Sequence, residues 1–194
     1  MVTPSKITLR KWQKLHWHDP LTDLVNLGKL QAQLEGSGVR PTVEDLRERD
    51  LRPYLEWRQA ALFCYFVGDA VLKTPVAYSL IEDEDYDCVV QWVADGTHHF
   101  APVQLKEVVP KTLNAKAELN VEMEKLGKYV TSSNTVVAIH LNQSGRLEFD
   151  SIVAPTTSCA EVWIYGSLTA SQSQWFLYGN LLKEPRGYEI AYPT

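Results

Sequence analysis

The sequence predicts an α/β protein in which helices flank one mixed β-sheet. Three strand-like runs lie close together at residues 76–82, 87–94 and 100–109, and an amphipathic helix pattern follows at about 114–131. A buried strand pattern returns at residues 135–141. Because a helix between two buried strands is typical of a right-handed parallel crossover, we expect parallel as well as antiparallel pairing in the sheet.

The elements before these strands are predicted to be helical. Apolar residues recur at helical spacing after Asp19 and Pro20, and Gly36-Ser37-Gly38 ends the run. These apolar residues are Leu21, Leu24, Val25, Leu27, Leu30 and Leu34. Thr42 suits the cap of a short helix, with Asp45 three residues later. We therefore divide the chain into a helical N-terminal extension, residues 1–50, and an α/β core, residues 51–194.

A second helix is predicted over residues 53–72, with Pro53 in its first turn. One stripe of this helix combines a carboxylate with apolar side chains, namely Glu56, Ala60, Phe63, Val67 and Val71. Glu56 has two interpretations of similar weight. It either sits at the exposed helix start, where it favours the helix dipole, or it faces the sheet and contributes to a site there.

The remaining elements follow from turn and periodicity signals. The loop at 94–97 (Ala-Asp-Gly-Thr) predicts a hairpin between the second and third strands. The helix at 114–131 has its apolar face at Leu119, Met123, Leu126 and Val130. We expect Glu124 and Lys128 to form an i, i+4 pair on its outer side. Residues 161–166 predict a further strand, and the aromatic tail beyond residue 168 is expected to hold a short helix and irregular chain.

Composition and charge limit the function classes. With 194 residues, 45% hydrophobic and 22% charged, the chain resembles an ordinary globular protein. Its net charge of −5 opposes binding to nucleic acid, because phosphate contacts are made by Lys and Arg. The charge is uneven, however, since Lys6, Arg10, Lys11 and Lys14 all precede the first acid, Asp19.

The cysteines and the apolar segments predict a cytoplasmic protein. Cys64, Cys88 and Cys159 are odd in number and far apart, which does not suit a disulfide framework. The N-terminus lacks an apolar leader segment. The longest apolar run, residues 60–72, is too short to span a bilayer, so we expect no membrane association.

Two neighbouring strands carry the residues that point to chemistry. Asp87 opens the second strand of the core, and Gln104 and Lys106 lie on the third. Because strand side chains alternate between faces, Gln104 and Lys106 point the same way. The apolar side of this strand is expected to hold Val103, Leu105 and Val108. An acid, an amide and a lysine around one point suit metal-assisted phosphodiester cleavage.

This arrangement resembles the PD-(D/E)XK nuclease superfamily, which has the restriction-endonuclease-like fold. In that family an acid at a strand start is followed, on the next strand, by an acid or Gln, one spacer and a Lys. Asp87, Gln104 and Lys106 match these positions, and Glu56 matches the acid that the family often carries on the preceding helix. The resemblance covers residues 51–167 and implies an α-β-β-β-α-β core.

The resemblance implies a magnesium-dependent endonuclease that hydrolyses phosphodiester bonds of DNA rather than RNA. Mg²⁺, with Mn²⁺ as the alternative, would be held by Asp87, Gln104, the carbonyl of Leu105 and Glu56. Lys106 would act at the phosphate or orient the attacking water. Members of this fold often act as dimers, so a homodimer is also open.

Several alternatives remain open at this stage. Asp85 competes with Asp87, since both point the same way on a strand. Gln104 stands where the family more often has an acid, and Tyr86 stands where its name gives Pro. These departures favour a second hypothesis, a non-catalytic relative that uses the fold for binding or assembly. In a third hypothesis, Asp87 and Lys106 only form an ion pair.

The histidines give weaker signals. His16 and His18, and the adjacent His98 and His99, lack partners at zinc-site spacing. His98 and His99 are expected to be exposed at the hairpin. His140 lies in a buried strand and is expected to be a core histidine with satisfied hydrogen bonds.

Overall fold

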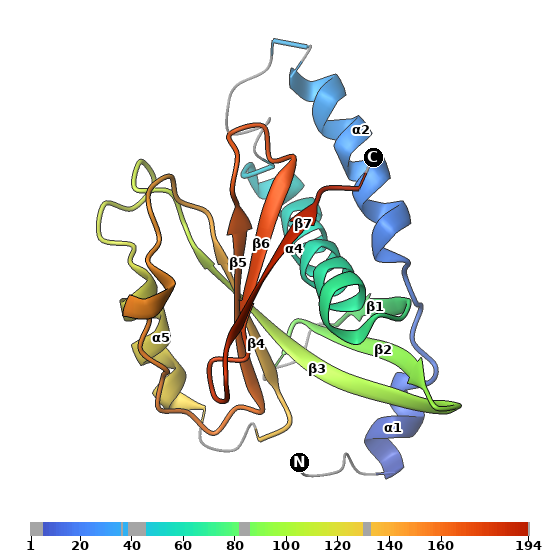
Figure 1. The fold of residues 1–194 in the computed structure, drawn as a ribbon. Coiled ribbons are helices and arrows are strands. Elements are labelled where there is room, and N and C mark those ends of the chain that lie inside the picture. Colours follow the sequence, from blue (N-terminus) through green and yellow to red (C-terminus); the bar gives the residue numbers. More distant parts are fainter. Residues whose placement is uncertain (1–5, 36, 39–45, 82–85, 130–132, 194) are drawn as a thin grey trace. The chain divides into compact units, whose positions relative to one another are not determined.

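The computed structural model describes residues 6–35, 37–38, 46–81, 86–129 and 133–193. Within them the chain has an α/β fold with four α-helices and one seven-stranded mixed sheet (Figure 1). The helices are α1 (Lys6–Trp12), α2 (Pro20–Glu35), α4 (Arg52–Phe66) and α5 (Leu119–Glu124). The strands are β1 (Val76–Leu80), β2 (Cys88–Ala94), β3 (Thr97–Val108), β4 (Val136–Leu141), β5 (Glu161–Ser167), β6 (Gln174–Gly179) and β7 (Arg186–Ala191). The predicted α/β class is confirmed.

The chain forms two compact units. The first comprises residues 1–14, 81–89 and 101–192, and the second comprises residues 15–80, 90–100 and 193–194. Strands β2 and β3 contribute residues to both units. The predicted division at residue 50 stays a prediction.

In the second unit, the two predicted helices form close to their expected bounds. α2 packs along α4, and α4 continues into a π-helical segment, Val67–Leu72, so that helical structure covers the predicted range 53–72. The segment ends where Lys73 adopts a left-handed conformation with a φ of 52°. Gly68 is required here because a Cβ atom on it would lie 3.0 Å from Cγ2 of Val76.

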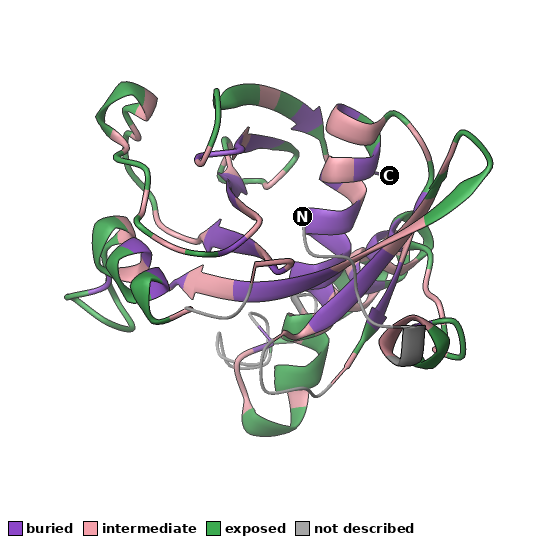
Figure 2. Cartoon of the chain, turned by 90° about the horizontal axis from the view of Figure 1, so that it is seen from below, coloured by how far each residue is buried: buried purple, intermediate pink, exposed green. Residues whose placement is uncertain are grey.

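The predicted hairpin is confirmed between β2 and β3. Its turn residues, Asp95 and Gly96, have φ angles of 51° and 70°, which the Asp-Gly dipeptide accommodates readily. The tip of this hairpin is exposed (Figure 2).

The predicted parallel return is confirmed in the first unit. β3 pairs with β4 in parallel, and β4 pairs with β5 in parallel. In this register Gln104 pairs with Val137 and Lys106 with Ile139. Paired residues of adjacent strands share a face, so Gln104 and Lys106 lie on the face of β4 that carries Val137 and Ile139.

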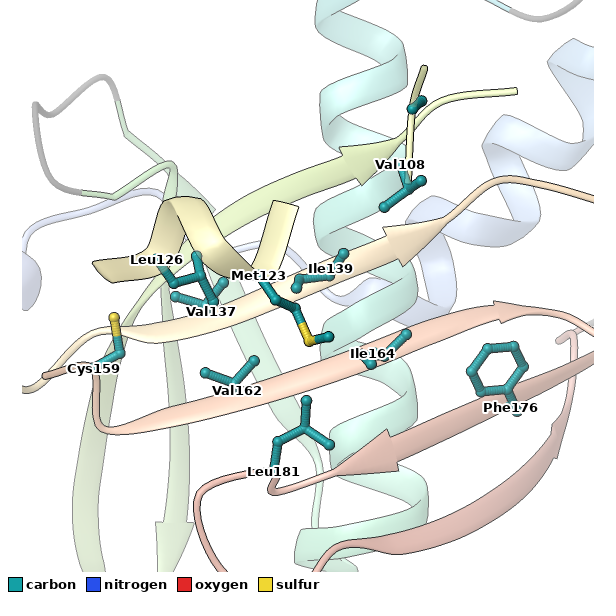
Figure 3. Packing of buried hydrophobic residues seen from close by; sticks show 11 residues of the cluster. Val108, Met123, Leu126, Val137, Ile139, Cys159, Val162, Ile164, Phe176 and Leu181 are labelled. Atoms are coloured by element: carbon teal, nitrogen blue, oxygen red, sulfur yellow. The ribbon is translucent and has the colours of Figure 1, made fainter. Parts of the chain in front are cut away.

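That face is covered by Met123 of α5 and by Leu126 of the 3₁₀ turn that follows it, Lys125–Lys128, and both side chains pack over the strands (Figure 3). The cluster is fully apolar and nearly solvent-free, with Met123 at 4% and Leu126 at 1% exposure. Val108 belongs to this same cluster. The expectation that Val108 lies on the same side as Val103 and Leu105 is therefore wrong. Val108 is two residues from Lys106 and four from Gln104, so strand alternation puts its side chain on their face of β3.

Helix α5 is shorter than predicted. It covers only Leu119–Glu124 and continues as a 3₁₀ turn, Lys125–Lys128, whereas a helix was expected over residues 114–131. Before it, the side chain of Asn114 accepts a hydrogen bond from the Lys116 N–H and stabilises a turn. Glu124 and Lys128 do not pair, because the 3₁₀ turn breaks the i, i+4 geometry.

The expectation of a short helix and irregular chain beyond residue 168 is also wrong. The tail forms β6 and β7, and antiparallel pairing joins β5 to β6 and β6 to β7. Trp175 and Phe176 are buried in β6, which gives the run of aromatic residues a role in the sheet rather than on a helix. The predicted positions of Thr42, Asp45, Asp85 and Val130 lie outside the described residues.

Candidate functional site

Asp87 is held in the first unit by hydrogen bonds on both of its sides. Its N–H donates to the carbonyl of Val103 at 2.9 Å, and its carbonyl accepts from the N–H of Ile81 at 2.9 Å. The residue stands directly before β2 and is half-buried. Its backbone is therefore fixed by sheet hydrogen bonds, and its side chain is directed by β3.

The carboxylate of Asp87 accepts two hydrogen bonds from β3. The Leu105 N–H donates to Oδ2 at 2.6 Å, and Nε2 of Gln104 donates to the same oxygen. Hydrogen bonds to an ionised carboxylate are among the stronger ones in proteins. The predicted proximity of Asp87 to Gln104 is present in the structure, and the backbone of the spacer residue Leu105 joins them.

The side-chain amide of Gln104 lies between two oxygens. Besides the Asp87 carboxylate, its Nε2 lies 3.4 Å from the carbonyl oxygen of Leu105. Gln104 is only 8% exposed. Two acceptor oxygens thus converge on one donor, and the amide orientation follows from that hydrogen-bond network. The NH₂ group occupies the place where a cation would also be attracted by both oxygens.

Lys106 lies on the same face of β3 as Gln104. Its Nζ is 5.9 Å from the ring centroid of Tyr129, a distance compatible with a cation–π contact. Among the described residues Lys106 forms no ion pair, so the pairing with Asp87 expected by the third hypothesis is not observed. The Lys106 side chain is only partly buried.

Glu56 belongs to the second unit, near the start of α4. Its carboxylate lies 3.6 Å from Nε of Arg52, and the two side chains are 61% and 74% exposed. An exposed i, i+4 pair of this kind contributes little to stability. The exposed-start interpretation accounts for these contacts, and the metal-ligand role of Glu56 stays a prediction.

The donor groups of the site are chemically uniform. Asp87 supplies a carboxylate, Gln104 an amide oxygen if its amide turns over, and Leu105 a backbone carbonyl. These are hard oxygen donors, which Mg²⁺ and Mn²⁺ prefer. Among the described residues no cluster of three or more His, Cys, Asp or Glu side chains suits a metal ion.

Sequence reasoning missed a network around Asp23 in the second unit. The Asp23 Oδ2 accepts from Nε1 of Trp57 at 2.9 Å and from the hydroxyl of Tyr78 at 2.8 Å. Nδ1 of His18 lies 3.4 Å from the same oxygen. Burial, followed by the hydrogen bond from its hydroxyl to Asp23, raises the pKa of Tyr78. No local sequence pattern predicts this network, because its members are far apart in the sequence.

The other predicted histidine and cysteine environments are structural. His140 is 3% exposed and stacks on Tyr165 with ring centroids 5.0 Å apart, so its expected place in the core is confirmed, whereas the satisfaction of its hydrogen bonds stays a prediction. His99 stacks on Trp92 at the exposed hairpin. All three cysteines are buried and form no disulfide among the described residues, and burial raises the pKa of the Cys159 thiol.

Comparisons with protein-family models, curated proteins and solved structures give no match to this chain. None of the helices in the described part of the chain is long and apolar enough to cross a membrane.

Proposed function

We propose that this protein is a metal-dependent nuclease that hydrolyses phosphodiester bonds of DNA. The observation that carries the proposal is the convergence of the Asp87 carboxylate, the Gln104 amide and the Leu105 carbonyl on one point. Lys106 follows on the same face of β3, without an ion-pair partner among the described residues. A carboxylate, a carbonyl oxygen, an amide that supplies its own oxygen once it turns over, and a lysine are groups that can serve this reaction.

The order of the elements supports the same proposal. Along the chain α4 precedes β1, β2 and β3, which α5 and β4 then follow. This is the α-β-β-β-α-β order of the restriction-endonuclease-like core. Asp87 stands at the start of the second strand and Lys106 on the third, as in the resemblance to the PD-(D/E)XK superfamily.

Mg²⁺ or Mn²⁺ fits the donor set of this site. Asp87, Gln104 and Leu105 would hold the ion. When bound, such an ion lowers the pKa of a coordinated water and polarises the phosphate. The Leu105 N–H fixes the direction of the Asp87 carboxylate, and in this proposal the Lys106 ammonium would stabilise the negative charge that develops on the phosphate.

A second candidate function is supported by the identity of Gln104. The Gln104 amide satisfies the Asp87 carboxylate without any cation, and Gln104 stands where the PD-(D/E)XK superfamily more often has an acid. A site that is stable without metal suits a non-catalytic protein that uses the nuclease fold for binding or assembly. The nuclease function is preferred because Lys106, on the same face of β3, is only partly buried and forms no ion pair among the described residues.

The test is a cleavage assay on single- and double-stranded DNA and RNA with Mg²⁺ or Mn²⁺. Cleavage of DNA by the wild-type protein is expected, with loss on addition of EDTA. The Lys106→Ala and Asp87→Asn variants are expected to lose cleavage by about 100-fold or more, because each removes a group that stabilises transition-state charge.

Lys116→Ala is the matched control, since Lys116 is an exposed lysine of the same unit without an ion pair, and its activity should be unchanged. Cleavage that survives in Lys106→Ala would refute the assigned site. No cleavage by the wild type, together with no Mg²⁺ or Mn²⁺ binding by calorimetry, would refute the nuclease function and favour the non-catalytic binding function.

A further inference from the structure

Helix α1 belongs to the same compact unit as the candidate site. Trp12, the last residue of α1, is 4% exposed. Its indole Nε1 donates to the hydroxyl of Tyr86 at 3.3 Å, and the two rings meet edge to face with centroids 6.1 Å apart. Tyr86 directly precedes Asp87 in the chain, so α1 is anchored at the residue next to the candidate carboxylate.

The cations of this segment are exposed. Arg10, Lys11 and Lys14 are all exposed, and none takes part in an ion pair found among the described residues. At about 100° per residue, Arg10 lies about 200° around the helix from Trp12. Because Trp12 faces inward, Arg10 faces away from the protein, with Lys11 on the flank.

This concentration of charge is unusual for the chain. The protein carries a net charge of −5, yet its first 18 residues hold Lys6, Arg10, Lys11 and Lys14 and no acid. Cations in the last turn of a helix interact favourably with the helix dipole, which partly explains the positions of Arg10 and Lys11. Lys14 lies beyond the helix end and needs another explanation.

We propose that Arg10, Lys11 and Lys14 form a phosphate-backbone contact for the DNA on which the candidate site acts. This inference rests on the proposed function and adds to it the surface that holds the substrate. Phosphate contacts orient nucleic acid without reading its sequence, and they are made mainly by Arg and Lys. The anchor between Trp12 and Tyr86 fixes the end of α1 at the chain neighbour of Asp87, in the same compact unit as the candidate site.

The test is DNA binding by fluorescence anisotropy across a range of salt concentrations, on the full chain with Ca²⁺ replacing Mg²⁺ to suppress cleavage. The variant carries Arg10→Gln, Lys11→Gln and Lys14→Gln. The control carries Lys116→Gln, Arg146→Gln and Arg186→Gln, which remove the same number of exposed charges from the same unit. Circular dichroism checks that both remain folded.

Each phosphate contact contributes about 0.9 to the slope of log K against log salt, so three lost contacts lower that slope by about 3. At about 0.15 M salt this corresponds to a loss of affinity on the order of 100-fold for the α1 variant. The control variant should change the slope by less than about 1, because dispersed charges make no specific phosphate contact.

The outcomes separate this inference from the proposed function. Equal slopes for the α1 variant and the control, with cleavage by the wild type intact, would overturn the α1 contact and leave the nuclease standing. Weaker DNA binding in the α1 variant, with no metal-dependent cleavage by the wild type, would support the contact and overturn the nuclease. Binding of the wild type to anionic lipid vesicles but not to DNA would overturn the inference.

Discussion

Replacement of Gln104 by Glu is expected to make the stability of the protein depend on a divalent cation. Gln104 is 8% exposed, and its Nε2 contacts the Asp87 carboxylate and, at 3.4 Å, the Leu105 carbonyl. In the Gln104→Glu protein a carboxylate takes the place of that donor and faces two acceptor oxygens. Without a bound cation or a proton, the introduced carboxylate repels the Asp87 carboxylate and has no donor to offer to the Leu105 carbonyl.

The size of the effect follows from the geometry. Two unit charges about 3.5 Å apart repel by about 5 kcal/mol at an effective dielectric constant of about 20. The lost hydrogen bond to Asp87 adds about 1 to 2 kcal/mol. Side-chain movement and sharing of a proton between the carboxyls recover part of this cost. We therefore expect unfolding free energy to fall by about 3 to 5 kcal/mol at alkaline pH in EDTA. Acidic pH should relieve the loss, because protonation of either carboxyl restores a donor.

Divalent cations should reverse the destabilisation. A cation present at about 100 times its dissociation constant stabilises the folded state by about 2.7 kcal/mol. Two carboxylates attract it more strongly than one, so Mg²⁺ should stabilise the Gln104→Glu protein more than the wild type. Urea unfolding followed by tryptophan fluorescence, in EDTA and in Mg²⁺, measures both quantities.

Gln104→Met is the matched control, because it removes the amide without adding a charge. If Gln104→Glu in EDTA is as stable as Gln104→Met, the side chain at position 104 does not face Asp87. If Mg²⁺ leaves the Gln104→Glu protein unchanged, these oxygens do not form a cation site, and the reasoning on metal binding is refuted.

Two further predictions concern stability alone. Asp23→Ala should lower the unfolding free energy of the second unit by about 3 kcal/mol in urea titrations, since it leaves the fully buried hydroxyl of Tyr78 without its acceptor; an unchanged midpoint would contradict the network. Gly166→Ala should lower the melting temperature markedly, because its Cβ would lie 2.8 Å from the Leu141 carbonyl oxygen and 2.8 Å from a ring carbon of Phe176. Gly127→Ala is its control, since that Cβ would come no closer than 3.6 Å to a neighbour, and equal melting temperatures of the two variants would exclude the steric argument.

Elements with strong local signals were predicted well. The Asp95–Gly96 turn was identifiable because both residues tolerate positive φ, and its hairpin fixed the neighbouring strands. The parallel return through β4 followed from a helix pattern between two buried strands. In both cases, the information lies within a few residues or within one periodic segment.

The errors arose where distant contacts override local patterns. Ser and Thr residues around position 170 suggest an irregular tail, but pairing with β5 makes the following segment a strand. The spacing of Leu119, Met123 and Leu126 suits a long helix, yet only a short helix is needed to cover Val137 and Ile139. Tertiary packing thus decided the length of α5 and the structure of the tail.

The contrast between Asp87 and Asp23 shows which part of a site a sequence can disclose. Asp87 meets Gln104 and Leu105 through one hairpin, so strand alternation alone brings their side chains into register. Asp23 lies on an amphipathic helix, where an acid normally faces solvent. Its donors, Trp57 and Tyr78, come from another helix and from β1, and only the packing of these elements decides that the carboxylate faces inward. A carboxylate whose partners lie on adjacent strands can therefore be inferred from periodicity, whereas one whose partners lie on separate packed elements cannot.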